Sequence, residues 1–128
     1  MDRNPIHTEK APEAIGPYSQ AIVNDGVLYC SGQIPLDPET GEAEDASLAA
    51  ETTRCLRNLE AVCEEAGTEL ANALRLTVYT TNLEAFAEIN EAYGAFFESD
   101  PPARAAVGVA ALPKGVRVEI DAIVAVTR

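Results

Sequence analysis

The chain has little of what most catalytic and metal-binding sites are built from. Its only histidine, His7, lies in a polar N-terminal segment without a second ligand type at metal-binding spacing. We therefore expect neither a metal site nor a histidine-based triad. The three cysteines, Cys30, Cys55 and Cys63, are odd in number, widely spaced and outside any paired-cysteine motif. This pattern predicts reduced thiols and disfavours a disulfide framework or a zinc site.

Positive charge is also scarce. Nine Lys and Arg residues face 21 Asp and Glu residues, which gives a net charge of -12, and only Lys10 and Lys114 are lysines. Such a charge repels phosphate backbones and anionic lipid, so we expect neither nucleic acid nor a membrane as a partner. An acidic, lysine-poor surface is tolerated in a salt-rich cytoplasm, and the composition therefore favours a halophilic source as a hypothesis.

Long apolar runs are missing as well. No run approaches the roughly 20 apolar residues of a membrane span, and residues 1–5 contain no apolar signal core. These absences predict a cytoplasmic protein. The apolar content of 47% in 128 residues is enough for one core without disulfides. We therefore expect a single domain over residues 1–128, without internal repeats.

The first half of the chain predicts an arm, a hairpin and a helix. Prolines disfavour a regular element within residues 1–17 and predict an arm that lies across the domain. Asp25 and Gly26 separate two short apolar runs, residues 18–23 and 27–31, which predicts a β-hairpin. From Asp45 to Gly67 apolar residues recur at spacings of three and four, which predicts an amphipathic helix with its cysteines on the apolar face.

The second half predicts strands at residues 74–81, 103–111 and 116–126, with a helix from Leu83 to about Glu98 between the first two. Alternation in the last strand places Glu119 away from the helix-covered core. Two strands, a helix, a strand, a helix and two strands describe an α+β sandwich. Its simplest form is one sheet with two helices on one face.

Two polar residues stand out in apolar surroundings. Arg104 is the only charge between Asp100 and Lys114 and has small neighbours. A guanidinium matches a carboxylate bidentately, so Arg104 is interpreted either as a clamp for a ligand carboxylate or as the partner of a buried acidic side chain. Asn90 lies in the apolar stripe of the second helix and is expected to face the sheet. Its amide either makes a structural hydrogen bond or orders a site.

The sheet face without helices is expected to carry Arg104, Ala106 and Gly108 on one strand and Glu119 and Ile123 on another. This mixture is too polar for a core and too apolar for plain solvent, so we expect subunit association to cover it. If the last two strands form a hairpin, Arg104 and Glu119 lie about 13 Å apart, beyond the reach of one small ligand. Either these strands are not neighbours, or the site combines two subunits.

Five motifs in order make the chain similar to a known family. They are IGPYSQ at residues 15–20, SGQIP at 31–35, NEAYGAFF at 90–97, PAR at 102–104 and VEIDA at 118–122. Together they resemble the reactive intermediate deaminase family (RidA, formerly YjgF). The resemblance runs nearly from end to end.

The resemblance implies a chorismate-mutase-like fold and a homotrimer with ligand sites in clefts between subunits. It also implies cofactor-free hydrolysis of 2-enamino and 2-imino acids, such as 2-aminoacrylate and 2-iminobutyrate, to 2-keto acids and ammonia. Arg104 matches the residue that holds the substrate carboxylate, and Glu119 matches the acid that orients or deprotonates water. The other matched cleft residues are Tyr18, Ser31, Gly32 and Asn90.

The chain departs from the family pattern near Gly108, where relatives often have an acidic residue, and at Ala106, where many relatives have a cysteine. Cysteine chemistry at that position is therefore excluded, and a slightly larger cleft is expected. Two other functions stay open: a non-catalytic trimer that senses small 2-keto acids, and the translation inhibition or RNA cleavage reported for some relatives. The charge of -12 weighs against RNA.

Overall fold

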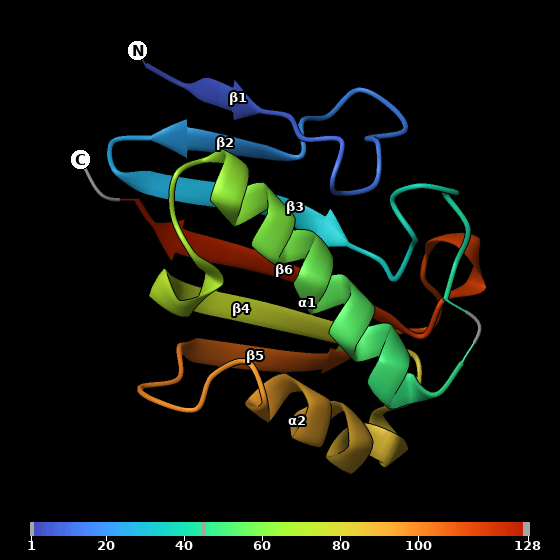
Figure 1. The fold of residues 1–128 in the computed structure, drawn as a ribbon. Coiled ribbons are helices and arrows are strands. Elements are labelled where there is room, and N and C mark those ends of the chain that lie inside the picture. Colours follow the sequence, from blue (N-terminus) through green and yellow to red (C-terminus); the bar gives the residue numbers. More distant parts are fainter. Residues whose placement is uncertain (1, 45, 127–128) are drawn as a thin grey trace.

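One mixed β-sheet with two helices forms the fold (Figure 1). The computed structural model describes residues 2–44 and 46–126. In these residues the elements are β1 (Asn4–Ile6), β2 (Ala21–Asn24), β3 (Val27–Gln33), α1 (Leu48–Glu65), β4 (Ala73–Thr80), α2 (Phe86–Gly94), β5 (Ala103–Gly108) and β6 (Val118–Ala125). The strand order is β1-β2-β3-β6-β4-β5, and only the β4–β5 pair is parallel. The predicted α+β sandwich is confirmed.

The predicted hairpin and first helix are both present. β2 and β3 pair antiparallel around Asp25 and Gly26, whose φ angles of 50° and 77° suit a tight hairpin turn. α1 begins at Leu48, where the side chain of Ser47 accepts a hydrogen bond from the amide of Ala50. It ends at Glu65, and the predicted start at Asp45 lies outside the described residues.

The core lies between α1 and the helix-covered face of β3, β4 and β6 (Figure 1). In β6, buried residues alternate strictly with partly exposed ones, and Glu119 belongs to the second set. The predicted orientation of Glu119, away from the helices, is confirmed. The largest fully buried apolar side chains include Leu28, Leu56, Leu59, Leu76, Ile89 and Ile120.

The N-terminal arm was predicted to contain no regular element, and this prediction is wrong for three residues. Asn4–Ile6 forms the edge strand β1 and pairs antiparallel with β2. Pro5 is tolerated there because an edge strand can leave an amide position unpaired. The segment that follows, residues 7–20, is the loop that crosses one end of the sheet.

The hairpin considered for the last two strands does not form. β5 pairs in parallel with β4 through the α2 crossover and lies at the sheet edge, while β6 lies on the other side of β4. Residues that pair across neighbouring strands extend from the same face of a sheet. Leu76 pairs with Arg104 of β5 and with the buried Ala122 of β6, so the Arg104 side chain extends from the helix-covered face. Glu119 extends from the opposite face. The shared face expected for Arg104 and Glu119 is therefore wrong.

The second helix is shorter than predicted. A 3-10 turn at Leu83–Ala85 precedes α2, which ends at Gly94. Ile89 and Tyr93 are buried on α2, whereas Asn90 is exposed, so the prediction that Asn90 lies in the buried apolar stripe is wrong. α2 packs against α1 and lies beside the β5 edge of the sheet (Figure 1). Neither α1 nor α2, among the described helices, is long and apolar enough to cross a membrane.

Salt should stabilise this protein. Most of its acidic residues are exposed, and the last turn of α1 carries Glu64 and Glu65 without a basic residue, against the helix dipole. Screening about 1 kcal/mol of repulsion should raise the melting temperature by about 4 °C between roughly 0.1 M and 1 M KCl. A Glu64→Gln/Glu65→Gln variant should show a smaller rise. A melting temperature that is flat or falls with KCl would contradict this expectation.

Candidate functional site

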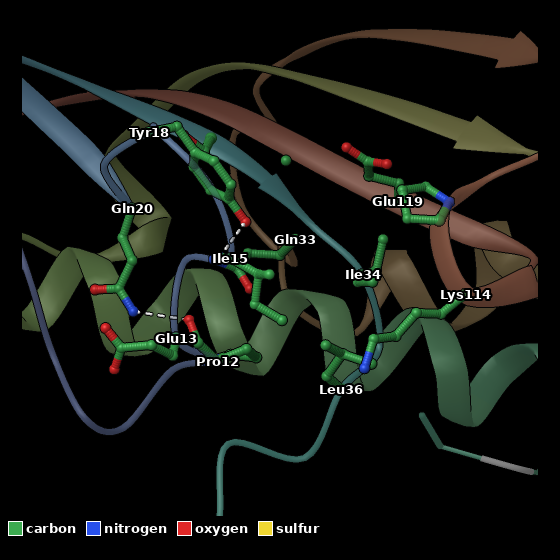
Figure 2. A pocket seen from close by; sticks show the side chains of 13 residues that line it. Pro12, Glu13, Ile15, Tyr18, Gln20, Gln33, Ile34, Leu36, Lys114 and Glu119 are labelled. Carbon is green, nitrogen blue, oxygen red and sulfur yellow. Dashed lines mark hydrogen bonds between the residues drawn. The ribbon is translucent and has the colours of Figure 1, made fainter. Parts of the chain in front are cut away.

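The six residues predicted for the site fall into two separate clusters. Tyr18, Ser31, Gly32 and Glu119 line a cavity of about 560 Å³, here called the Glu119 cavity. Asn90 and Arg104 line a second cavity of about 430 Å³ at α2, here called the Arg104 cavity. Figure 2 shows Glu119 and Tyr18 on either side of the Glu119 cavity, with Lys114 at its rim.

Glu119 lies directly over the backbone of Gly32. The β3–β6 pairing shifts register between Cys30 and Gln33, which brings the irregular part of β3 under the Glu119 side chain. A Cβ atom built on Gly32 would lie 2.0 Å from Oε2 and 2.9 Å from Cδ of Glu119. Only glycine leaves room for the carboxylate in this position.

The wall opposite Glu119 is held by Gln20, which the sequence analysis missed. Its side chain is 3% exposed, accepts a hydrogen bond from the amide of Thr8 and donates to the carbonyl of Pro12, at 2.7 and 2.9 Å. These bonds fix the N-terminal loop beside the cavity (Figure 2). Gln20 closes the IGPYSQ motif, but a single buried amide gives no periodic signal, so its role in holding this loop was not predicted.

Tyr18 and Ser31 differ in how tightly they are held. The Ser31 hydroxyl donates to the carbonyl of Ser19 at 2.6 Å, so its position is fixed. Tyr18 is 53% exposed, and its hydroxyl accepts a long 3.4 Å hydrogen bond from the amide of Ile15. The Tyr18 hydroxyl can therefore still donate to a ligand.

Glu119 is a better proton acceptor than an ordinary surface glutamate. Desolvation raises its pKa, and the negative charge of Asp121 raises the pKa further. No hydrogen bond from another described side chain holds the Glu119 carboxylate. A half-buried carboxylate with a raised pKa beside a cavity can take a proton from water.

Arg104 is held by α2. Its Nη1 donates to Oδ1 of Asn90 at 2.8 Å, and its guanidinium lies 4.8 Å from the ring centroid of Tyr93 and 5.2 Å from that of Phe86. Within residues 2–44 and 46–126, Arg104 forms no ion pair with a carboxylate. The interpretation as the partner of a buried acid is therefore wrong for the described chain, and its other N–H groups can bind a ligand.

Within one chain the two clusters are too far apart to share a small ligand. Tyr79 of β4 pairs with Glu119 on one side and with Val107 on the other. Arg104 precedes Val107 by three residues and lies two strands from Glu119, which gives about 14 Å between their Cα atoms. Their side chains also extend from opposite faces of the sheet. A ligand that contacts both needs two copies of the chain.

The thiols and the histidine are unsuited to catalysis. Cys30, Cys55 and Cys63 are buried and free. A hydrogen bond with Cys63, together with desolvation, raises the pKa of Cys30, and desolvation raises that of Cys55 well above its usual value. His7 lies 3.3 Å from Glu13 on the surface, and no group of metal-binding side chains occurs in the described part of the chain.

Comparison with known proteins decides the family. The family model described as endoribonuclease L-PSP matches residues 8–126. The chain belongs to this family. The predicted membership of the RidA (formerly YjgF) group is confirmed by a crystal structure of RidA from an Antarctic Psychrobacter, with a TM-score of 0.92 and 43% identity over 96% of this chain and 99% of that one.

Two other RidA-family relatives carry names or ligands that bear on function. Human 2-iminobutanoate/2-iminopropanoate deaminase is 45% identical over 121 residues, which are 94% of this chain and 88% of the human protein. The crystal structure of Escherichia coli TdcF with bound serine has a TM-score of 0.92 and 38% identity, over 97% of this chain and 99% of TdcF. The chain is similar to both over almost its whole length.

Proposed function

We propose that this RidA-family protein hydrolyses reactive 2-enamino and 2-imino acids to 2-keto acids and ammonia, without a cofactor. Arg104 holds the substrate carboxylate and Glu119 activates the attacking water. The observation that carries the proposal is a guanidinium without a carboxylate partner among the described residues, together with a proton-accepting carboxylate beside a cavity. The activity named for the human relative supports it.

The chemistry needs only these two charged groups. A guanidinium binds the α-carboxylate and so fixes the adjacent C=N carbon in the cavity. Glu119 takes a proton from water as the water oxygen bonds to this carbon, and the nitrogen is protonated to give a carbinolamine. A further proton then goes to nitrogen while the carbinolamine hydroxyl loses its proton to Glu119; the C=O bond forms as the C–N bond breaks, which releases ammonia and leaves the keto acid. No redox change occurs, and water supplies the oxygen.

The remaining predicted residues orient the substrate. In the proposed site Tyr18 and Ser31 contact the ligand from the Glu119 cavity, and Gly32 gives the carboxylate of Glu119 its space. Asn90 orients the guanidinium of Arg104. The serine bound in the TdcF structure supports the substrate class, because serine carries an α-carboxylate like that of an imino acid.

We also propose that the protein is a homotrimer in which each site combines two copies of the chain. The Arg104 cavity of one copy would meet the Glu119 cavity of the next. Three exposed apolar residues support an interface on the helix-free side of the sheet. They are Tyr18, Tyr29 and Val107, exposed by 53%, 48% and 40%.

A mixed-assembly assay tests the activity and the shared site together. 2-Aminoacrylate or 2-iminobutyrate is generated in situ by a dehydratase, and keto acid formation is followed. We expect acceleration by the wild type and little by Arg104→Ala or Glu119→Gln alone. If the two variants are co-expressed with different tags and purified over both, every purified trimer contains both variants and has one intact site of three, so about a third of the wild-type activity should return.

The control is an assembly of two differently tagged Arg104→Ala chains, which should stay inactive. No recovery in the mixed assembly would mean that both residues act within one chain or that their roles are wrong. If the wild type gives no acceleration but binds 2-ketobutyrate by calorimetry, the protein is a sensor of small keto acids. In that case Glu119→Gln should bind normally.

A further inference from the structure

Two carboxylates lie together on the helix-free face of the sheet. Glu119 and Asp121 are two residues apart on β6, so their side chains extend from the same face with about 7 Å between their Cα atoms. The Asp121 carboxylate is held, because Oδ2 accepts a hydrogen bond of 3.1 Å from the hydroxyl of Tyr79. Asp121 is therefore a fixed negative charge beside Glu119.

The side chain of Tyr79 on β4 reaches diagonally to Asp121 on the neighbouring strand β6. In the β4–β6 pairing Tyr79 lies opposite Glu119, and Thr77 lies opposite Asp121. The ring of Tyr79 thus lies next to Glu119 while its hydroxyl binds Asp121. Desolvation and the bond to Asp121 raise the pKa of Tyr79, so its hydroxyl remains a donor at neutral pH.

The other ionisable groups near Glu119 come from several elements. The N-terminal loop contributes Tyr18 and Glu13, and Glu13 lies next to His7. The turn before β6 contributes Lys114, whose Nζ donates to the carbonyl of Gly41 at 3.3 Å. α1 places the Cys55 thiol behind β6, where it donates to the carbonyl of Val118.

Two arginines complete the charged groups around Glu119. Arg117 precedes Glu119 by two residues but is bound to Glu51 of α1. In the proposed assembled site, Arg104 of a neighbouring copy would face Glu119. On β6 itself Asp121 is the carboxylate that shares the face of Glu119.

We propose that Asp121, held by Tyr79, is a positioning residue that sets the proton affinity of Glu119. A like charge nearby favours the neutral form of a carboxyl group, so Asp121 makes Glu119 a stronger base. A base works best when its pKa approaches the working pH. The catalytic consequence rests on the proposed function, whereas the effect on Glu119 itself does not.

The test is a titration of Glu119 in the assembled protein by carboxyl ¹³C NMR, with the resonance assigned by its loss in Glu119→Gln. In Asp121→Asn the midpoint of Glu119 should fall by up to about one pH unit, because the repelling charge is gone. Asp121→Glu keeps the charge and should restore the midpoint. Glu64→Gln removes the same charge from the exposed surface of α1 and should leave the midpoint unchanged.

The acid limb of the kcat/KM profile for imine hydrolysis should move to lower pH by the same amount in Asp121→Asn. A merely structural role for Asp121 would change stability or the plateau rate without moving this limb. Asp121→Ser carries the same test if the asparagine variant does not fold. An unchanged midpoint of Glu119 in a folded neutral variant would overturn the proposal.

The two proposals can fail separately. A shifted Glu119 midpoint in a protein that hydrolyses no imine would support the role of Asp121 and contradict the deaminase function. An active enzyme whose Glu119 midpoint and acid limb do not respond to Asp121 would support the deaminase and overturn the role of Asp121.

Discussion

Replacing Gly32 by alanine is expected to lower kcat/KM for imine hydrolysis about 100-fold while the protein stays folded. The new methyl group would lie 2.0 Å from Oε2 of Glu119, so one of the two must move. The carboxylate is the end of a flexible side chain, whereas Gly32 lies in the backbone of β3. The carboxylate therefore moves, and water activation is lost.

The expected result separates catalysis from stability. The melting temperature of Gly32→Ala should stay within a few degrees of the wild type, because the displaced Glu119 can turn towards the open cavity. Substrate binding through Arg104 should also persist, so kcat should fall more than KM rises. Both are measured with the coupled dehydratase assay and a thermal melt.

A double-variant cycle provides the control for this prediction. In Glu119→Ala the carboxylate that collides with the new methyl group is missing. Adding Gly32→Ala to this variant should therefore change the residual activity little, although Gly32→Ala alone is severe. If Gly32→Ala lowers the activity by the same factor in the wild type and in Glu119→Ala, Gly32 affects catalysis independently of Glu119.

Local pattern predicted the elements and faces that depend on neighbouring residues in the chain. The spacing of apolar residues predicted α1, and the pair Asp25 and Gly26 predicted the β2–β3 hairpin. The alternation of β6 predicted that Glu119 leaves the core. These features follow from periods of 3.6 and 2.0 residues, which the sequence displays directly.

Strand neighbours could not be predicted in the same way. The order that places β6 between β3 and β4 joins segments far apart in the chain, and nothing local to Arg104 reveals that its partner is Leu76. The period of a strand is two, so an error of one residue moves Arg104 to the other face. The same limit hid Tyr79, which lies beside Glu119 only because of the β4–β6 register.

The sequence identified residues of the candidate site, but it did not predict how they are arranged in space. The motifs singled out Arg104 and Asn90, and these two do form a hydrogen bond. They also singled out Gly32 and Glu119, which are in contact. The division into two distant clusters depends on the path of β5 along the sheet edge, which motif spacing does not specify.

The largest expected loss of stability follows removal of Arg117. Its Nε donates to Oε2 of Glu51 at 2.8 Å, its backbone amide donates to Oε1 at 3.2 Å, and its Nη2 binds both Glu51 and the carbonyl of Ala46. These bonds join the first turns of α1 to the start of β6, two residues before Glu119. Arg117→Met should lower the free energy of unfolding by about 3 kcal/mol.

The two partners of this ion pair should not be equivalent. The side chain of Glu51 is 6% exposed, whereas that of Arg117 is 40% exposed. Arg117→Met leaves a buried carboxylate without its cation, while Glu51→Gln leaves a guanidinium that water can reach. We therefore expect Glu51→Gln to cost only about 1 kcal/mol, since its amide oxygen can still accept from the Arg117 backbone.

The double variant Glu51→Gln/Arg117→Met decides whether the buried charge causes the loss. If it does, the double variant should be more stable than Arg117→Met alone, because no charge is left without a partner. Urea unfolding at one fixed protein concentration measures all four proteins, since assembly makes stability concentration-dependent. The contrary outcome is a loss of unfolding free energy in the double variant that equals the sum of the losses in the two single variants. That result would mean that Arg117 stabilises the protein through packing and its bond to Ala46, and that the charge of Glu51 contributes little.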